Sequence, residues 1–265
     1  MRALLLLLML GAGAVRADCS RPLNVPAAPQ SMSILPLKDG SVSGVVPEFY
    51  RALGKKAGCT FQFTIVPRAR LEAMFSTGEA DLLVTATKSP QRDKSGQFVP
   101  LFKYRATLVS LRPMGTPIRT MEDLAARDKL RVCVVRGFDY GEPYRKLLAA
   151  LEKEKRLCQA PDPRQVLRMI HANLADVTIL LPSSAFATAR EDNVLASSAD
   201  KLHFDALDQL PWQDAGVYVS TKSLTPSDQA TLLKVLRADG TSDAIMQAYE
   251  SIFPDKLLKI SARRL

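Results

Sequence analysis

Short apolar runs alternate with amphipathic stretches along the first part of the chain. Residues 61–66, FQFTIV, combine aromatic and β-branched side chains and predict a strand. Residues 70–76 carry apolar side chains at helical spacing, and Gly78 follows as a typical helix end. The apolar run at 81–85 predicts a buried strand. Alternating strands and helices favour a parallel sheet with helices on its faces. The pattern also predicts a strand at 23–25 and a helix at 48–57, which precede these elements in the same α/β unit.

The same alternation returns after residue 112. Thr120 is a good helix cap, with Asp123 three residues later. The pattern therefore predicts a second α/β unit, and the connections near 105–112 and 211–220 are its natural crossovers to the first. A cleft between two such units is the natural ligand site. The expected helices are 120–126, 140–155, 163–172, 183–190, 226–238 and 242–251, and the expected strands are 130–135, 157–160, 176–181 and 215–220.

The N-terminus has the pattern of a secretory signal peptide. Arg2 supplies the positive start, residues 3–10 form an apolar block, and cleavage is expected between Ala17 and Asp18. The block is shorter than the roughly 20 residues that span a bilayer. An uncleaved membrane anchor is the alternative. Asp18, which precedes Cys19, argues against lipidation at that cysteine.

Composition narrows the classes of partner. The chain is 47% hydrophobic and 24% charged, enough to build a sizeable core. Its net charge is +9, but the basic residues are scattered and form no arginine-rich arm, so we expect no nucleic-acid partner. The positive field favours small anions. With two histidines and no Cys-x-x-Cys pair, the sequence predicts no metal site and no cofactor.

The segment after the strand at 81–85 raises a question of function. Residues 86–92, ATKSPQR, present hydroxyl groups and Arg92 directly after the apolar run. One interpretation is a polar surface turn with an exposed arginine. The other is an anion site, because a guanidinium offers a planar fork of donors that fits a carboxylate.

The order of motifs resembles a known family. Each motif is short, but together they are similar to the extracytoplasmic solute-binding proteins of family 3, which serve ABC transporters for polar amino acids. The resemblance implies a type II periplasmic-binding-protein fold, α/β, with two lobes that are mostly parallel sheets flanked by helices. It implies a signal peptide at 1–17, lobe 1 at 18–109 plus 216–265, and lobe 2 at 110–215. The motifs that carry it lie at 44–58, 68–92, 98–102, 120–142 and 214–253.

The resemblance also implies a ligand site. In the family, the arginine of a Thr/Ser-x-x-Arg loop receives the carboxylate of the ligand, and Arg92 matches that position. Thr85, Thr87 and Ser89 are expected to add donors around it. Phe102 and Tyr104 flank the first crossover, and Trp212 lies at the second. We interpret Phe102, Tyr104 and Trp212 as candidate cleft walls, with core packing as the alternative for each.

Three departures from the family pattern concern the ligand. Where members that bind amino acids carry an aspartate for the ammonium group, this chain has Leu181 or Pro182. The early loop at 26–36 has no aromatic residue that could stack on a ligand. An ordinary α-amino acid is therefore not the expected solute, because a buried ammonium needs a partner.

The third departure follows the family's lobe-two glycine, which is Gly137 here. Phe138 and Asp139 stand where hydroxyl residues are usual. Tyr140 begins the predicted helix, whose N-terminus favours an anion. Asp139 would oppose an anion or hold a cation, and the alternative for it is a plain helix cap. We include all four residues in the predicted site.

The four cysteines fit the fold that the resemblance implies. Cys19 and Cys59 precede strands that are neighbours in that fold, so we predict a Cys19–Cys59 disulfide. Cys133 and Cys158 lie on or beside neighbouring strands of lobe 2 and are the second predicted pair.

We interpret the chain as a binding protein and not an enzyme. Dehydratases and domains of peptidoglycan-cleaving enzymes share this fold, but no catalytic motif is present beyond a Ser-x-x-Lys match at 198–201. His171 and His203 lie in patterns that favour structural roles. The predicted function is capture of a small solute with a carboxylate, as a periplasmic monomer, for an inner-membrane ABC permease. A sensory or accessory role without transport, and a dehydratase-like enzyme, are the alternatives.

Overall fold

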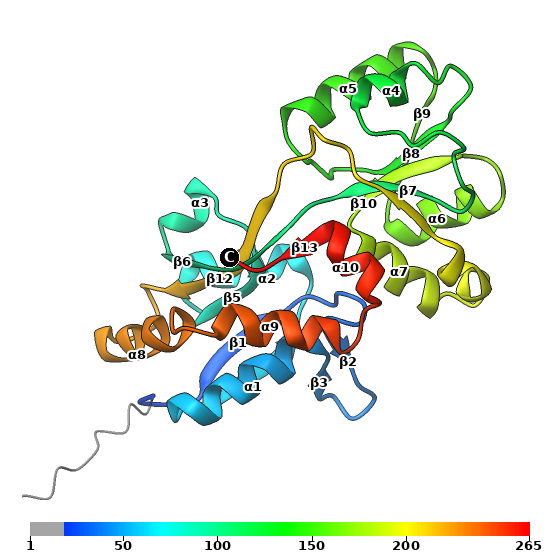
Figure 1. The fold of residues 1–265 in the computed structure, drawn as a ribbon. Coiled ribbons are helices and arrows are strands. Elements are labelled where there is room, and N and C mark those ends of the chain that lie inside the picture. Colours follow the sequence, from blue (N-terminus) through cyan, green and yellow to red (C-terminus); the bar gives the residue numbers. More distant parts are fainter. Residues whose placement is uncertain (1–18) are drawn as a thin grey trace, which may run out of the picture.

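A computed structural model describes residues 19–265 of the protein (Figure 1). The predicted signal peptide at 1–17 and its cleavage point lie outside these residues. Within the described part, no helix has the length and apolarity to span a membrane.

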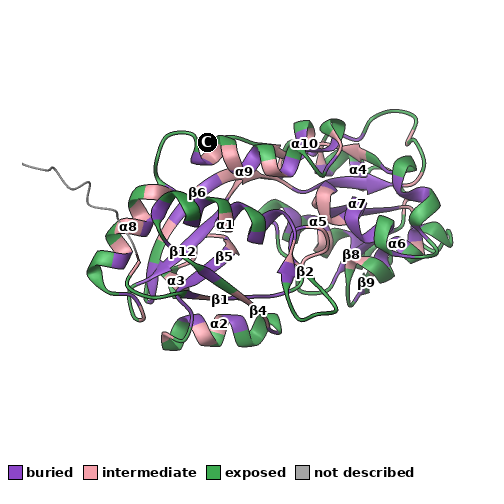
Figure 2. Ribbon diagram, turned by 90° about the horizontal axis from the view of Figure 1, so that it is seen from below, coloured by how far each residue is buried: buried purple, intermediate pink, exposed green. Residues whose placement is uncertain are grey.

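Among the described residues, lobe 1 contains three sheets, one of which is the short antiparallel pair β2 (Leu35–Pro36) and β3 (Val42–Ser43). Strands β1 (Leu23–Ala27) and β4 (Phe61–Ile65) pair in parallel. A four-stranded sheet has the order β13-β6-β12-β5. Helices α1, α8 and α9 pack together on one side, and α2 packs on β1 and β5 from the other (Figure 2). The bounds are β5 Leu82–Ala86, β6 Gly96–Tyr104, β12 Gln213–Ser220, β13 Ala262–Arg263, α1 Val45–Ala57, α2 Arg68–Thr77, α8 Pro226–Leu236 and α9 Thr241–Glu250.

Lobe 2 is built on one five-stranded sheet in the order β11-β7-β10-β8-β9. The strands β7, β8 and β10 are buried along their whole length. The helices α4, α5, α6 and α7 surround this sheet (Figure 1). The bounds are β7 Thr107–Ser110, β8 Val132–Val135, β9 Leu157–Ala160, β10 Val177–Leu180, β11 His203–Asp205, α4 Met121–Ala125, α5 Glu142–Lys153, α6 Pro163–His171 and α7 Pro182–Glu191.

The structure confirms the two-lobed α/β fold but corrects one detail of it. The sheets are not mostly parallel. The lobe-2 sheet is mixed, because β7 pairs antiparallel with β10 and β11, and all strand pairs of the four-stranded lobe-1 sheet are antiparallel. Strand β7 already belongs to the lobe-2 sheet, and β12 pairs with β6 from Gln213 onward. The two crossovers therefore lie near residues 105–106 and 211–212, a few residues before the boundaries expected from the sequence.

Local signals explain why several elements begin and end where they do. Gly58 ends α1 with a φ of 67°, a conformation that glycine adopts without steric cost. Thr120 and Asp123 form the reciprocal capping box at α4 that their spacing predicts. The sequence pattern did not predict the short elements β2 (Leu35–Pro36), β3 (Val42–Ser43), α3 (Pro90–Asp93) and β11, nor the 3₁₀ helix at Ala196–Lys201.

The C-terminal segment, residues 252–265, lies against both lobes. Strand β13 pairs with β6 opposite Tyr104 and Lys103, next to the first crossover. Helix α10 (Asp255–Ser261) contacts α7 of lobe 2, and Phe253 lies 6.5 Å from Phe186 of α7 between ring centroids. One of the clusters of buried apolar side chains runs from lobe 1 into lobe 2. The segment therefore joins the two lobes beside the crossover strands.

Both predicted disulfides are present. Cys19 is bonded to Cys59, and Cys133 is bonded to Cys158 across the parallel strands β8 and β9, where the two residues are direct partners. The bonds close stretches with sequence separations of 40 and 25 residues.

We expect the Cys133→Ser, Cys158→Ser double variant to lower the free energy of unfolding by about 3 kcal/mol, because the unfolded chain gains the freedom that the bond removes. Urea denaturation measured by circular dichroism tests this. Ser198→Ala is the control. It also changes a buried side chain of lobe 2, but it breaks no disulfide bond. A loss below about 0.5 kcal/mol would contradict the expectation.

Candidate functional site

A cleft of about 890 Å³ lies between the lobes. Lobe 1 contributes the loop after β1, the start of α2 and the segment from β5 to α3. Lobe 2 contributes the loop after β8, the beginning of α6 and one face of α7 along its length. Tyr104 and Gln213 from the crossover strands line it as well. The remaining residues that line it are Pro29, Gln30, Ser31, Arg68, Thr85, Thr87, Arg92, Gly137, Phe138, Asp139, Tyr140, Asp162, Pro163, Arg164, Leu181, Ser184, Thr188 and Glu191.

Arg92 lines the cleft, but its guanidinium already has a carboxylate partner. Its Nε and one Nη donate to the two carboxylate oxygens of Glu72 at 3.1 and 2.6 Å, and the other Nη donates to the carbonyl of Thr87 at 2.7 Å. The arginine side chain is 21% exposed. These contacts differ from both interpretations of the sequence. The Arg92 side chain is not exposed on a surface turn, and its guanidinium is not free of a carboxylate partner. Sequence analysis missed Glu72 because it lies on α2, 20 residues away.

The hydroxyl residues around Arg92 take different positions. Thr85 and Thr87 both line the cleft. Thr85 has a φ of 52°, an uncommon and strained conformation for a β-branched residue. Ser89 does not line the cleft. Its side chain caps the short helix α3 by accepting from the Arg92 amide, and its own amide donates to the hydroxyl of Tyr218 at 2.9 Å.

The loop after β8 brings the predicted lobe-2 residues to the opposite wall. Gly137, with a φ of 80°, precedes Phe138, whose side chain is 42% exposed at the cleft. Asp139 accepts from the amide of Gly141, which lowers the pKa of its carboxyl, and pairs with Arg145 at 2.6 Å. These contacts favour a structural role for the Asp139 carboxylate.

Tyr140 and Leu181 complete the floor of the cleft on the lobe-2 side. Tyr140 precedes α5, which begins at Glu142, and burial raises the pKa of its phenol. Leu181 caps α7 and lines the cleft where the resemblance places an aspartate in amino-acid-binding relatives. The position is apolar here, as the sequence indicates.

Two acids that the sequence analysis did not select also line the lobe-2 side. Glu191, at the end of α7, has its pKa raised by burial, with nearby Arg164 opposing the shift. Asp162 caps α6 by accepting from the amide of Gln165 at 2.9 Å. The lobe-1 wall therefore carries the cations Arg68 and Arg92, whereas the lobe-2 wall carries side chains of both signs. Glu191 lies ten residues after Leu181, so its approach to the cleft depends on the length of α7 and not on a local motif.

The aromatic residues near the crossovers separate into two groups. Tyr104 lines the cleft, and its hydroxyl donates to the Gln213 side chain at 3.0 Å. Phe102 does not line the cleft and packs on Tyr249, with 5.3 Å between ring centroids. Trp212 also lies away from it, between the guanidinium groups of Arg105 and Arg263 at 4.7 and 4.3 Å.

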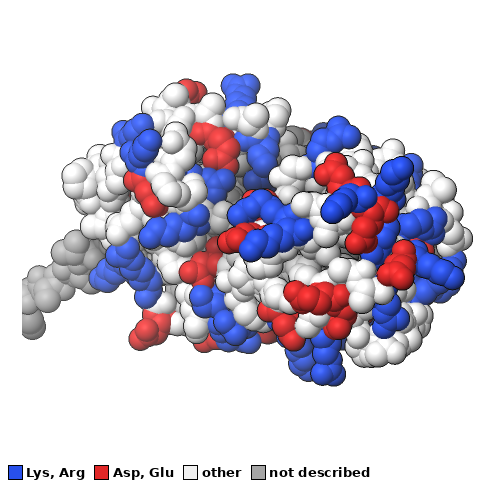
Figure 3. Space-filling view, turned by 90° about the horizontal axis from the view of Figure 1, so that it is seen from above, with Lys and Arg blue, Asp and Glu red and all other residues white. Residues whose placement is uncertain are grey.

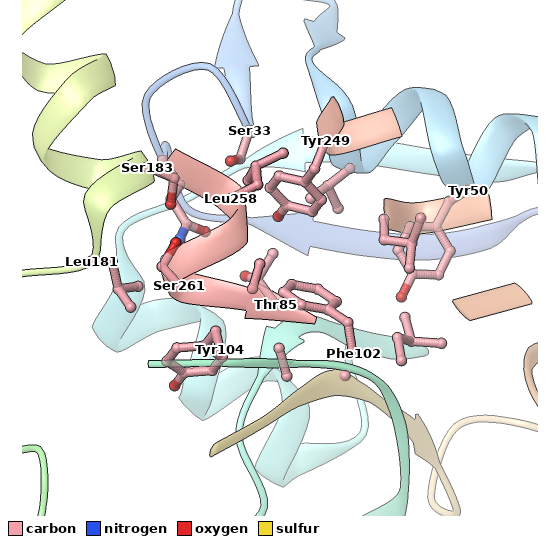
Figure 4. Close-up of a pocket in the computed structure, with 17 residues that line it drawn as sticks. Ser33, Tyr50, Thr85, Phe102, Tyr104, Leu181, Ser183, Tyr249, Leu258 and Ser261 are labelled. Carbon is pink, nitrogen blue, oxygen red and sulfur yellow. The ribbon is translucent and has the colours of Figure 1, made fainter. Parts of the chain in front are cut away.

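A smaller, partly open pocket of about 120 Å³ adjoins the cleft (Figure 4). Phe102, Tyr50 and Tyr249 line it together with apolar side chains of α1, α9 and α10. Gln30, Thr85, Tyr104 and Leu181 line both the cleft and this pocket. The two hollows are therefore neighbours that share a wall. We name the smaller one the side pocket.

The described residues show no arrangement typical of metal binding, and no group of three or more potential ligands occurs among residues 19–265. His171 lies 3.4 Å from the Ser198 hydroxyl, and His203 is exposed on β11. Neither histidine lines the cleft. On the face that Figure 3 shows, lysine and arginine side chains alternate with acidic ones and form no continuous basic surface.

Comparison with solved structures shows the same two-lobed fold in several proteins. An ancestral cationic amino acid solute-binding protein aligns with a TM-score of 0.64 and 18% identity, covering 88% of this chain and 96% of its own. Substrate-binding domain 2 of Lactococcus lactis GlnP, in an open conformation, aligns at 0.63 and 15%, covering 90% and 100%. A histidine kinase sensor domain similar to periplasmic binding proteins aligns at 0.59 and 21%, covering 87% and 96%.

The sequence itself supports a family assignment. Among curated proteins, none matches this chain. The profile of the bacterial extracellular solute-binding proteins, family 3, matches residues 25–251, which include both lobes and every residue named above as lining the cleft. The chain therefore belongs to the bacterial extracellular solute-binding proteins of family 3.

Proposed function

We propose that the protein captures a small solute bearing an acid group in the cleft between its lobes and delivers it, as a periplasmic monomer, to an inner-membrane ABC permease. The observation that carries this proposal is the cleft of about 890 Å³ lined by polar and charged side chains of both lobes. A solute that contacts both walls stabilises the closed arrangement through contacts that the open one lacks. The crossover strands β6 and β12 are the natural hinge.

The cationic side chains of the cleft support an acidic solute. Arg92 comes from lobe 1 and is held rigidly by Thr87 and Glu72. Arg68 lines the cleft from α2, and Arg164 faces it from lobe 2. A solute carboxylate would share the guanidinium of Arg92 with Glu72, or displace that side chain. Glu72 is 37% exposed, so its release into water carries a small cost.

The absence of an acid at Leu181 supports a solute without an α-ammonium group at that point. Glu191 and Asp162 lie elsewhere on the lobe-2 wall and provide counter-charge for a cationic substituent. A thermal-shift screen with dicarboxylates, aromatic acids, amino acids and polyamines tests the charge of the solute. Stabilisation by a polyamine alone would contradict an acidic ligand.

We expect Glu72→Gln to raise the affinity for an acidic solute about five- to tenfold. The amide carries no charge, so the fork of Arg92 loses its competitor, and removing one nearby like charge is worth about 1 kcal/mol. Isothermal titration calorimetry at low ionic strength measures the change.

Glu79→Gln is the matched control, because Glu79 lies in the turn after α2 and, among the described residues, its carboxylate accepts only from the Thr77 hydroxyl. A fall in affinity in the Glu72 variant would instead indicate that this carboxylate is needed to position Arg92.

A sensory role is the second candidate. The histidine kinase sensor domain with the same fold supports it, since a closing cleft can signal to a membrane partner as readily as it can load a permease. An enzymatic role has one argument in its favour, an ancestral binding protein of this fold described as a precursor of cyclohexadienyl dehydratase. We propose binding over catalysis because, among residues 19–265, no histidine reaches the cleft.

A further inference from the structure

The side pocket has the features of a binding subsite and not of a packing defect. It is partly open, measures about 120 Å³, and shares Gln30, Thr85, Tyr104 and Leu181 with the cleft. A solute in the cleft could carry a substituent that extends past Thr85 and Tyr104. Such a substituent would enter the side pocket. Figure 4 shows Tyr104 and Leu181 on one side of the pocket and Tyr50 at the other.

The walls of the side pocket select for an apolar, ring-shaped group. Tyr50, Phe102 and Tyr249 contribute aromatic rings, and Leu258 and Ile245 add aliphatic surface. An apolar cavity of roughly 150 Å³ accepts a benzene molecule, so the volume suits one aromatic ring. Aromatic walls favour a ring further through edge-to-face and offset contacts.

Two polar atoms of residues that line the side pocket have no hydrogen-bond partner within the described part of the chain. The hydroxyl of Tyr50 is buried and makes no hydrogen bond with any residue in the range 19–265, and the residue is only 2% exposed. The side-chain oxygen of Gln30, which lines the pocket at the cleft side, is also buried without a partner. A buried hydroxyl without a partner is costly, and a ligand group that donates to it or accepts from it removes that cost.

Part of the side pocket comes from outside the family match. Leu258, Ser261 and Ala262 line it and belong to α10 and β13, whereas the family profile ends at residue 251. The C-terminal segment therefore adds a wall that the matched region alone does not provide. This wall lies outside the matched range, and it makes the side pocket a candidate determinant of the solute.

From these observations we infer that the side pocket binds the aromatic ring of the captured solute, with a ring hydroxyl directed at Tyr50, while the acid group of the same molecule stays in the cleft near Arg92. The ligand class is a hydroxyaryl carboxylic acid. This inference rests on the proposed function, because it assigns the second half of the same solute.

Calorimetric titration with three sets of probes tests the inference. The sets are straight-chain carboxylates without a ring, phenyl-substituted carboxylates, and the corresponding 4-hydroxyphenyl carboxylates, each with one to three methylene groups before the carboxylate. In at least one chain length, we expect the phenyl compound to bind about 10- to 100-fold more tightly than the compound without a ring. The hydroxyl is expected to add about five- to tenfold.

Two variants and one control assign the effect to the side pocket. Tyr50→Phe should remove the gain from the ring hydroxyl and leave the affinity for the phenyl compound unchanged. Ala262→Leu should fill the pocket and remove the gain from the ring in both aromatic sets. Tyr144→Phe is the control, because the Tyr144 hydroxyl in lobe 2 is equally buried and without a partner but does not line the side pocket.

The outcomes separate the two proposals. If ring-free acids bind and the aromatic compounds bind no more tightly, the side-pocket inference is overturned and the proposed function stands. If no acid of any set binds the wild-type protein, both are rejected. If Ala262→Leu does not fold, the comparison of Tyr50→Phe with Tyr144→Phe still decides, since equal effects of these two substitutions overturn the inference.

Discussion

Replacing Arg92 with alanine is expected to weaken the binding of an acidic solute at least about 100-fold, the largest loss we expect from any single change in the cleft. Truncating one partner of a hydrogen-bonded charge pair commonly costs about 2–5 kcal/mol. Here the loss has two sources. The solute loses the guanidinium fork, and the carboxylate of Glu72 loses its partner and repels an incoming acid.

Titration calorimetry and ligand-induced thermal shifts measure this loss. Arg131→Ala is the matched control, because Arg131 forms a similar two-point pair with Asp176 but does not line the cleft. The Arg92→Ala, Glu72→Gln double variant should recover part of the affinity by removing the repulsion. Unchanged binding in the single variant would reject the role of Arg92, and an unfolded variant would show that the pair is structural.

The second large effect is expected at Leu257 of α10. Its side chain is fully buried in the cluster that joins the lobes, so Leu257→Ala should lower the free energy of unfolding by about 2–5 kcal/mol. Because α10 contacts lobe 2 while β13 pairs within lobe 1, both lobes should lose stability together. Denaturation followed by far- and near-UV circular dichroism should therefore give one shared transition.

Leu265→Ala is the control for this experiment, since Leu265 is 57% exposed and its loss should change stability by less than about 0.5 kcal/mol. Two separate transitions in the Leu257 variant would show that the lobes fold independently. A small loss of stability would show that the C-terminal segment contacts the crossover strands but does not stabilise the two lobes against unfolding.

Periodicity and local chemistry were enough to predict most of the fold. The α4 capping box needs only Thr120 and Asp123, three residues apart, and the structure forms it as expected. The strand β9 has the predicted bounds, Leu157–Ala160, because apolar alternation and a following Pro161 mark it clearly. Such features depend on neighbours in sequence, which a single chain displays directly.

The parts that sequence analysis missed depend on contacts between distant residues. The segment α10–β13 has no strong pattern of its own, and it forms where Ala262 and Arg263 find the free edge of β6. The Glu72–Arg92 pair joins two helices of lobe 1 that only the tertiary fold brings together. Trp212 and Phe102 were correctly placed near the crossovers, but which face of the strand they occupy follows from pairing and not from spacing.

The position of Trp212 has a practical consequence. It is the only tryptophan of the chain and is stacked between Arg105, which follows β6, and Arg263 of the C-terminal strand. Both guanidinium groups and the indole lie beside the crossovers, so the hinge motion proposed above would alter their stacking. Intrinsic fluorescence should therefore report opening and closing in real time, without a label and without any substitution in the cleft.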